Sequence, residues 1–199
     1  MSFRIFVIIT FGFHFFIVNA QTEKKIDNQT ILWSRYYNQL TLNDKWSLHS
    51  EFDNRLFLNP VTENLFVIRS QARYKLNSTV ELGTGFAYFA VATQDPENTS
   101  NFLTPEYRGQ QDIVWKNTIG KINLSQRFQV EERFIRNASK TELLDGSTFN
   151  WRFRFRIQAE YEIWKKNNHF LKTIVHEEIL LNAGKSILKN TFDQNRIYL

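Results

Sequence analysis

The chain has 199 residues, and its 25 Lys and Arg against 20 Asp and Glu give a formal net charge of +5. An apolar share of 42% excludes a disordered chain. Because cysteine is absent, disulfides, Cys-ligated zinc and a catalytic thiol are excluded as well.

The first 20 residues are predicted to be a secretory signal peptide. Arg4 supplies the positive n-region, Ile5–Val18 the apolar h-region, and Ala20 the cleavage position. An apolar stretch of about 14 residues is shorter than the ~20 needed for a transmembrane helix. Export also argues against nucleic acid as the partner of this basic chain.

After a polar leader at 21–29, apolar and polar residues alternate with period two, which predicts β-strands in one domain over 30–199. The predicted strands are Ile31–Leu42, Trp46–Phe57, Leu65–Leu76, Val80–Ala90, Glu106–Asn117, Ile122–Phe134, Phe149–Tyr161, Phe170–Asn182 and the start of one at Phe192–Leu199. These are eight strands and part of a ninth, each of about 11 residues, whereas strands of globular proteins average 5–6.

The connections between these strands alternate in length. Short turns are predicted at Asn43–Lys45, Asn77-Ser78, Thr118–Lys121 and Lys165–Asn168, and longer loops at Leu58–Thr62, Val91–Pro105, Ile135–Ser147 and Ala183–Thr191. Short turns at one rim and longer loops at the other are typical of outer-membrane barrels. We therefore predict an all-β fold, an antiparallel up-and-down transmembrane β-barrel.

Aromatic spacing supports the membrane interpretation. Trp151 and Tyr161 share one face of a strand, and their spacing corresponds to roughly 25 Å along the axis of a tilted barrel, the height of an outer-membrane apolar band. A soluble secreted barrel or sandwich also alternates apolar and polar residues, so it remains an alternative.

The polar faces of the strands are rich in arginine and carboxylates. Lipid disfavours such charges by ~2–4 kcal/mol each at the midplane, so we expect them to line the lumen, for binding or as an ion-pair lattice. The candidate lumen residues are Glu51, Asp53, Arg55, Arg69, Arg73, Glu81, Arg127, Glu131, Arg133, Arg152, Arg154, Arg156 and Glu160. In a barrel of eight strands these pairs would fill the lumen, whereas ten or twelve strands would leave a weakly anion-preferring passage.

No catalytic or metal site is predicted. His49 could serve as a base, but Ser50 points to the other face, and Ser47 lies two residues along the strand, ~6.6 Å away and too far for a hydrogen bond. His176 alternates with Glu178, which is too few ligands for a metal. We therefore expect no cofactor, with a barrel-wall hydrolase acting on envelope lipid as an alternative.

Several segments carry a family resemblance: "WSLHSEFDNRLF", "PEYRGQQDIVWK", "QRFQVEERF", "FNWRFRFRIQAEY" and "FDQNRIYL". They resemble the Bacteroidota proteins grouped as domain of unknown function 2490, which are predicted outer-membrane barrels without an established activity. The resemblance covers about Ile31 to Leu199. It implies a bacterial outer-membrane location, with outer-membrane lipid and the barrel-assembly machinery as partners. The arginine rows make a small solute or anion a further candidate.

In that family, the segment resembling Phe192–Leu199 opens further strands. We therefore expect this chain to be part of a barrel of ten to twelve strands, because an unpaired edge is not tolerated in lipid. The alternative is a closed barrel of eight strands in which Phe192–Leu199 is a tail. The expected function is that of an outer-membrane barrel of structural, binding or narrow-pore type.

Overall fold

The computed structural model describes residues 28–92, 102–139, 141–167, 169–187 and 191–199. The predicted signal peptide at Met1–Ala20 and most of the polar leader lie outside the described residues. No helix in the described part of the chain is long and apolar enough to cross a membrane.

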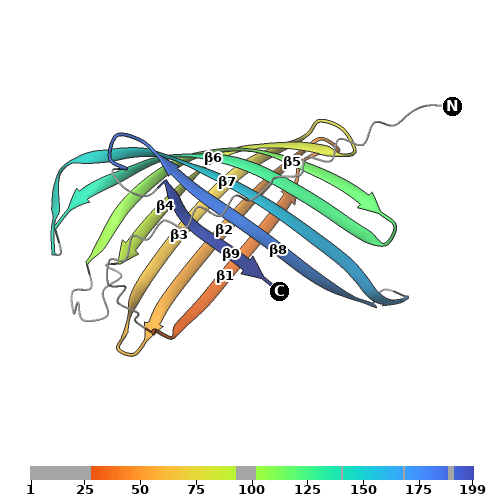
Figure 1. The fold of residues 1–199 in the computed structure, drawn as a ribbon, viewed down its shortest axis with the longest axis horizontal. Coiled ribbons are helices and arrows are strands. Elements are labelled where there is room, and N and C mark those ends of the chain that lie inside the picture. Colours follow the sequence, from red (N-terminus) through yellow and green to blue (C-terminus); the bar gives the residue numbers. More distant parts are fainter. Residues whose placement is uncertain (1–27, 93–101, 140, 168, 188–190) are drawn as a thin grey trace, which may run out of the picture.

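Within the described residues, nine antiparallel strands form one sheet, ordered as they follow one another in the chain. They are β1 (Ile31–Thr41), β2 (Trp46–Leu58), β3 (Val61–Lys75), β4 (Val80–Ala92), β5 (Leu103–Ile119), β6 (Ile122–Ala138), β7 (Leu143–Lys166), β8 (His169–Ala183) and β9 (Phe192–Tyr198). The sheet curves into a half-barrel (Figure 1). The predicted all-β, antiparallel, up-and-down architecture is thus confirmed.

The predicted strand length of about 11 residues is wrong for the middle of the sheet. β5 and β6 have 17 residues each and β7 has 24. Pairing of β6 with β7 continues to Ala138 and Leu143, so most of the loop predicted at Ile135–Ser147 is a paired hairpin. Backbone hydrogen bonds can pair two strands where apolar and polar residues do not alternate. The strand lengths predicted from alternation are therefore too short.

Two further predictions about the connections need correction. Leu58 pairs with Val61, so the medium loop predicted at Leu58–Thr62 shrinks to a turn of Asn59 and Pro60. The alternative in which Phe192–Leu199 is a tail is also wrong, because β9 pairs with β8 from His176 to Leu181.

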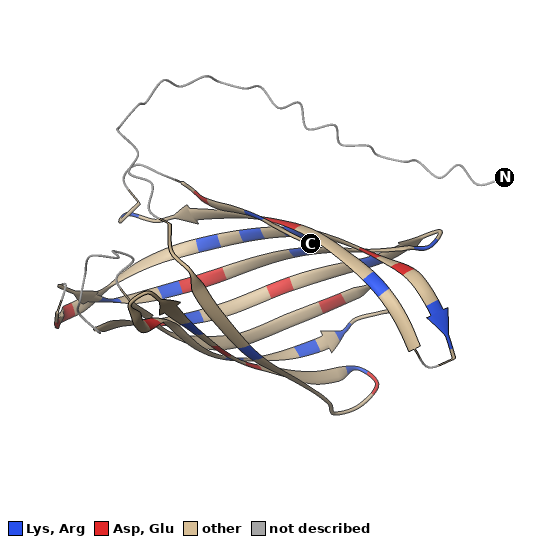
Figure 2. Ribbon diagram, turned by 90° about the horizontal axis from the view of Figure 1, so that it is seen from below, with Lys and Arg blue, Asp and Glu red and all other residues tan. Residues whose placement is uncertain are grey.

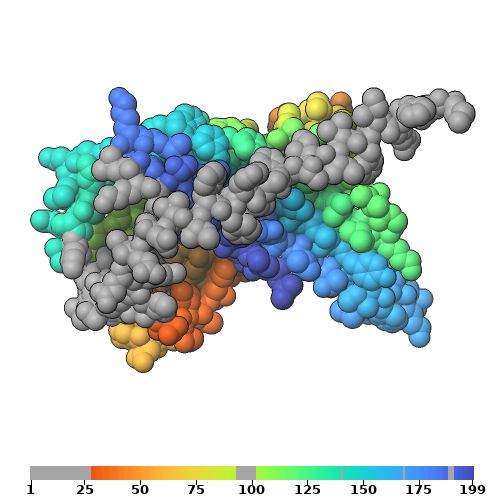
Figure 3. Space-filling view, viewed as in Figure 1, coloured from red at the N-terminus to blue at the C-terminus, as the bar shows by residue number. Residues whose placement is uncertain are grey.

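The hairpin ends of β5–β6 (green) and β7–β8 (blue) project from the same side of the molecule (Figure 3).

Side chains alternate between the two surfaces of the half-barrel. On β7, Phe155 is exposed on the convex side, whereas on the concave side its neighbour Arg154 faces one cavity and Arg156 faces two. Lys, Arg, Asp and Glu recur along most of the strands (Figure 2). Large apolar side chains therefore point outwards, and the charged rows line the interior.

A few apolar residues depart from this rule and lie on the concave side of the sheet. Val67, Ala87 and Phe89 form a buried cluster, with Leu65 packed against them. The guanidinium of Arg108 lies 3.6 Å from the centre of the Phe89 ring, a cation–π contact. This cluster was not predicted from the sequence, because the interior faces of the strands were expected to be polar throughout.

Glycine permits a close approach of β3 and β4. A Cβ atom at Gly85 would lie 2.1 Å from the backbone oxygen of Ser70 on the neighbouring strand. Only a residue without a side chain fits there, so Gly85 lets the backbones of β3 and β4 approach closely.

Candidate functional site

Two cavities on the concave side contain the predicted lumen residues. The larger has a volume of about 920 Å³ and the smaller about 770 Å³. The predicted residues lining one or both are Glu51, Arg55, Arg69, Arg73, Glu81, Arg127, Arg133, Arg152, Arg154, Arg156 and Glu160. The remaining two, Asp53 and Glu131, are fully buried, and each is ion-paired with arginines that line the cavities.

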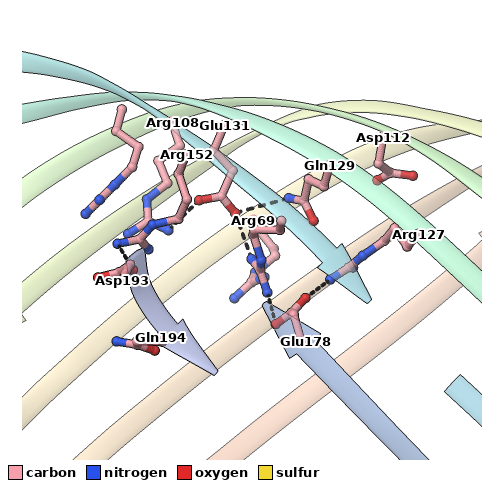
Figure 4. A network of polar contacts seen from close by, with 12 residues as sticks. Arg69, Arg108, Asp112, Arg127, Gln129, Glu131, Arg152, Glu178, Asp193 and Gln194 are labelled. Carbon is pink, nitrogen blue, oxygen red and sulfur yellow. Dashed lines mark hydrogen bonds and ion pairs between the residues drawn. The ribbon is translucent and has the colours of Figure 1, made fainter. Parts of the chain in front are cut away.

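Glu131 on β6 joins three strands. Arg108 on β5 donates to one of its carboxylate oxygens at 3.0 Å, and Arg154 on β7 donates to the other at 2.7 Å. Gln129 adds a hydrogen bond at 3.2 Å. Figure 4 shows Glu131 within this group of converging side chains. A carboxylate with no exposed area is thus held by two guanidinium groups, as a buried charge requires.

Glu178 on β8 extends the network across the next strand. Its two carboxylate oxygens accept hydrogen bonds from Arg127 and Arg154, both at 2.7 Å. Arg154 therefore bridges Glu131 and Glu178. Arg152 reaches further, to Asp193 on β9 at 2.9 Å.

Another carboxylate, that of Glu106 on β5, is also shared by two arginines. Arg108 donates to it in a bidentate arrangement at 2.7 and 3.0 Å, and Arg133 also donates to both of its oxygens. All three residues are at least nine-tenths buried. Bidentate pairing of this kind fixes geometry as well as charge.

Ion pairs continue over the first strands. Arg35 on β1 pairs with Glu51 at 3.0 Å and with Asp53 at 3.1 Å, and so fastens β1 to β2. Arg55 stacks on the Trp33 ring with its guanidinium 3.8 Å from the ring centre.

Arg73 on β3 pairs with Asp112 on β5 at 2.9 Å and also with Glu81 on β4. Glu81 in turn accepts from Lys116 at 2.8 Å. Arg73 thereby spans β4 and joins strands that are not neighbours in the sheet.

His49 lines the larger cavity and contacts two hydroxyl groups. Its Nε2 is 3.1 Å from Ser47 Oγ, and its Nδ1 is 2.6 Å from the Tyr37 hydroxyl. The prediction that Ser47 is too far from His49 is therefore wrong. The ~6.6 Å separation applies to the backbone, and side chains on one face can lean towards each other along the strand.

The comparisons with known proteins give the family. A protein-family model, described as a protein of unknown function (DUF2490), matches residues 30–199. The chain belongs to DUF2490. The match includes every strand from β1 to β9, and it confirms the family resemblance inferred from the sequence. No curated protein and no solved structure matches this DUF2490 chain.

Several interior residues of this DUF2490 chain were missed by the sequence analysis: Arg35, Glu106, Arg108, Asp112 and Glu178. Three of them lie on β5, where Gly109 and Gln111 on the outer face obscure the contrast between the two sides. The period of two in Glu106, Arg108, Gln110 and Asp112 was the available signal.

Metal binding finds no support in the described part of this DUF2490 chain, where no group of three or more His, Asp or Glu side chains could hold an ion. His176 instead packs against Tyr198 of β9, with ring centres 4.3 Å apart. Glu178, its neighbour on the same face, is occupied by arginines.

Proposed function

We propose that this chain forms the wall of a bacterial outer-membrane β-barrel of narrow-pore type, without catalytic activity. Lipid would contact its convex face, and the barrel-assembly machinery would insert it. Small polar solutes or anions would enter its arginine- and carboxylate-lined interior.

The observation that carries this proposal is the inverted distribution of polarity. Phe86, Phe128 and Phe155 are 79%, 47% and 40% exposed, whereas Asp53 and Glu131 are 0% exposed. In water, so many exposed aromatic side chains would form an apolar patch of a size that soluble monomers rarely carry. Acyl chains make the same surface favourable, and they exclude charges to the interior.

The interior supports the pore component of the proposal. The two cavities share part of their lining, so they adjoin along the concave face. The ion pairs hold the arginines against the wall, which leaves about 920 and 770 Å³ of space inside. A space of this kind can take hydrated ions and small solutes.

Expression of the full-length gene tests membrane insertion. We expect the protein to be recovered only with detergent, and to migrate faster on a gel when unheated than when boiled, because a folded barrel is compact. The boiled sample is the internal control. Recovery as a soluble monomer whose migration is insensitive to heating would contradict the proposal.

Conductance across a planar bilayer then tests the pore. We expect small, discrete conductance steps with the folded protein and none with the boiled sample. A folded, membrane-inserted protein without conductance would mean that the ion-pair network closes the interior, and the narrow-pore assignment would fail.

A hydrolase is the second candidate, favoured by the contact between Ser47 and His49. When Tyr37 donates to Nδ1, the ring proton lies on Nε2, so His49 donates to Ser47 and cannot accept its proton. A neutral phenol also stabilises the protonated imidazole less than the carboxylate of a catalytic triad does.

A fluorophosphonate probe tests this second candidate. We expect no labelling of the wild-type protein in detergent, for the two reasons given above. The Ser47→Ala variant is the control, read out by intact mass. Labelling of the wild type that disappears in Ser47→Ala would establish a reactive serine and replace the non-catalytic proposal.

A further inference from the structure

The two interior cavities adjoin at a group of residues with an excess of positive charge. Arg35, Glu51, Arg69, Arg127 and Arg156 line both cavities. Glu51 pairs with Arg35 at 3.0 Å and is 3.5 Å from Arg69. Glu51 is thus the one carboxylate among the described residues that line both cavities, although Arg35 also pairs with Asp53 and Arg127 with Glu178.

Arg127 and Arg156 oppose each other directly on neighbouring strands. They are register partners in the antiparallel pairing of β6 with β7, and both face the interior. Like charges in directly opposed positions of a sheet are destabilising. A negative charge close to Arg127 and Arg156 would therefore stabilise this pair.

Two carboxylates act electrostatically on Arg127 and Arg156, namely Glu178 on β8 and Asp112 on β5, and Asp112 is already paired with Arg73. Glu178 is the register partner of Arg156 on β8, but its two oxygens are bonded to Arg127 and Arg154. Arg156 itself has no hydrogen bond or ion pair through its side chain within the described residues. Its guanidinium faces the cavities without a directly bonded carboxylate, because Glu178 is already bonded to two other arginines.

Further donors at this boundary are buried and unused. Nε of Arg127 makes no hydrogen bond among the described residues, and Nε of Arg69 makes only the 3.5 Å contact with Glu51. Nε2 of Gln110, which lines the larger cavity, also has no hydrogen-bond partner there. Buried donors without acceptors are costly, so an acceptor-rich ligand would be favoured.

We propose that Arg69, Arg127 and Arg156 form a binding site for an oxyanion of the phosphate class where the two cavities adjoin. A tetrahedral oxyanion presents several acceptor oxygens, and guanidinium groups from different strands can each bind it through a planar pair of donors. A divalent anion would offset the surplus charge around Glu178. Monatomic chloride offers no such directional acceptors.

This inference depends on the arrangement of the interior and not on membrane insertion, so the two proposals are tested separately. Calorimetric titration of the full chain in detergent micelles with inorganic phosphate, at constant ionic strength in chloride buffer, tests the site. We expect saturable binding to the wild type. In Arg156→Gln, binding should be about tenfold weaker, since a charge-assisted hydrogen bond is lost.

Lys121→Gln is the matched control, because Lys121 is exposed in the tight turn between β5 and β6 and the change in charge is the same. Its phosphate affinity should equal that of the wild type. Unheated gel mobility confirms that each variant is folded. Equal affinity in the wild type and Arg156→Gln, or no binding to the wild type, would overturn the proposal.

Short-chain phosphatidylglycerol, titrated in parallel, distinguishes a free phosphate from a lipid head group. We expect inorganic phosphate to bind and the lipid to add nothing, because the site faces the interior. Binding of the lipid alone, with no response to inorganic phosphate, would overturn the assignment to a soluble oxyanion.

Discussion

Replacing Glu131 with Gln is expected to lower the free energy of unfolding by about 3 kcal/mol, because it leaves two buried guanidinium groups without a shared carboxylate. Glu131 has no exposed area and pairs with Arg108 and Arg154. Both arginines keep a second carboxylate, Glu106 and Glu178 respectively, which places the effect at the lower end for a broken buried pair. Urea unfolding of the protein in lipid vesicles measures the change.

Glu142→Gln is the control for this prediction. Glu142 is exposed beside the β6–β7 hairpin, and among the described residues no ion pair engages its side chain. Its substitution should change stability by less than about 0.5 kcal/mol. A loss of similar size in both variants would show that the interior pairs contribute nothing special to stability.

A charged substitution on the convex face should also have a large effect. Phe155 lies between Trp151 and Tyr161 on β7 and is register partner to Ile179. If this face meets lipid, Phe155→Arg should destabilise the inserted protein by about 2–4 kcal/mol, the cost of arginine near the bilayer midplane. The unheated, compact gel band should decrease in proportion.

Leu171→Arg provides a control at a different depth on the same surface. Leu171 is 55% exposed and pairs with Trp164 near the β7–β8 turn. If the convex face meets lipid around Phe155, the distance of roughly 20 Å along the barrel axis would place Leu171 beyond the apolar band, where arginine costs about 0–1 kcal/mol. Equal effects of the two substitutions would argue for an aqueous environment around the whole face.

Much of the wall could be predicted from the sequence because alternation reports which side of a strand is apolar. In Phe149–Tyr161 the contrast between aromatic residues and arginines is nearly unbroken, and the structure has the same two faces there. The family resemblance was recognised from such segments and is confirmed by the family match.

Other features had no signal of that kind. The length of β7 depends on backbone pairing with β6, which needs no particular side chains. The contact of Ser47 with His49 depends on side-chain direction within one strand, and backbone spacing does not report it. The sharing of Glu178 by Arg127 and Arg154 depends on which side chains reach across the interior, a property of three-dimensional curvature.

The order of the strands has a consequence for how the wall can assemble. Within the described part of the chain, each strand pairs only with those adjacent in sequence, so every pairing step closes a short stretch of chain and costs little entropy. Such a sheet can form one hairpin at a time, starting from either edge, because no step requires contact between segments that are distant in the sequence. Each newly added strand then presents the template on which the following one docks.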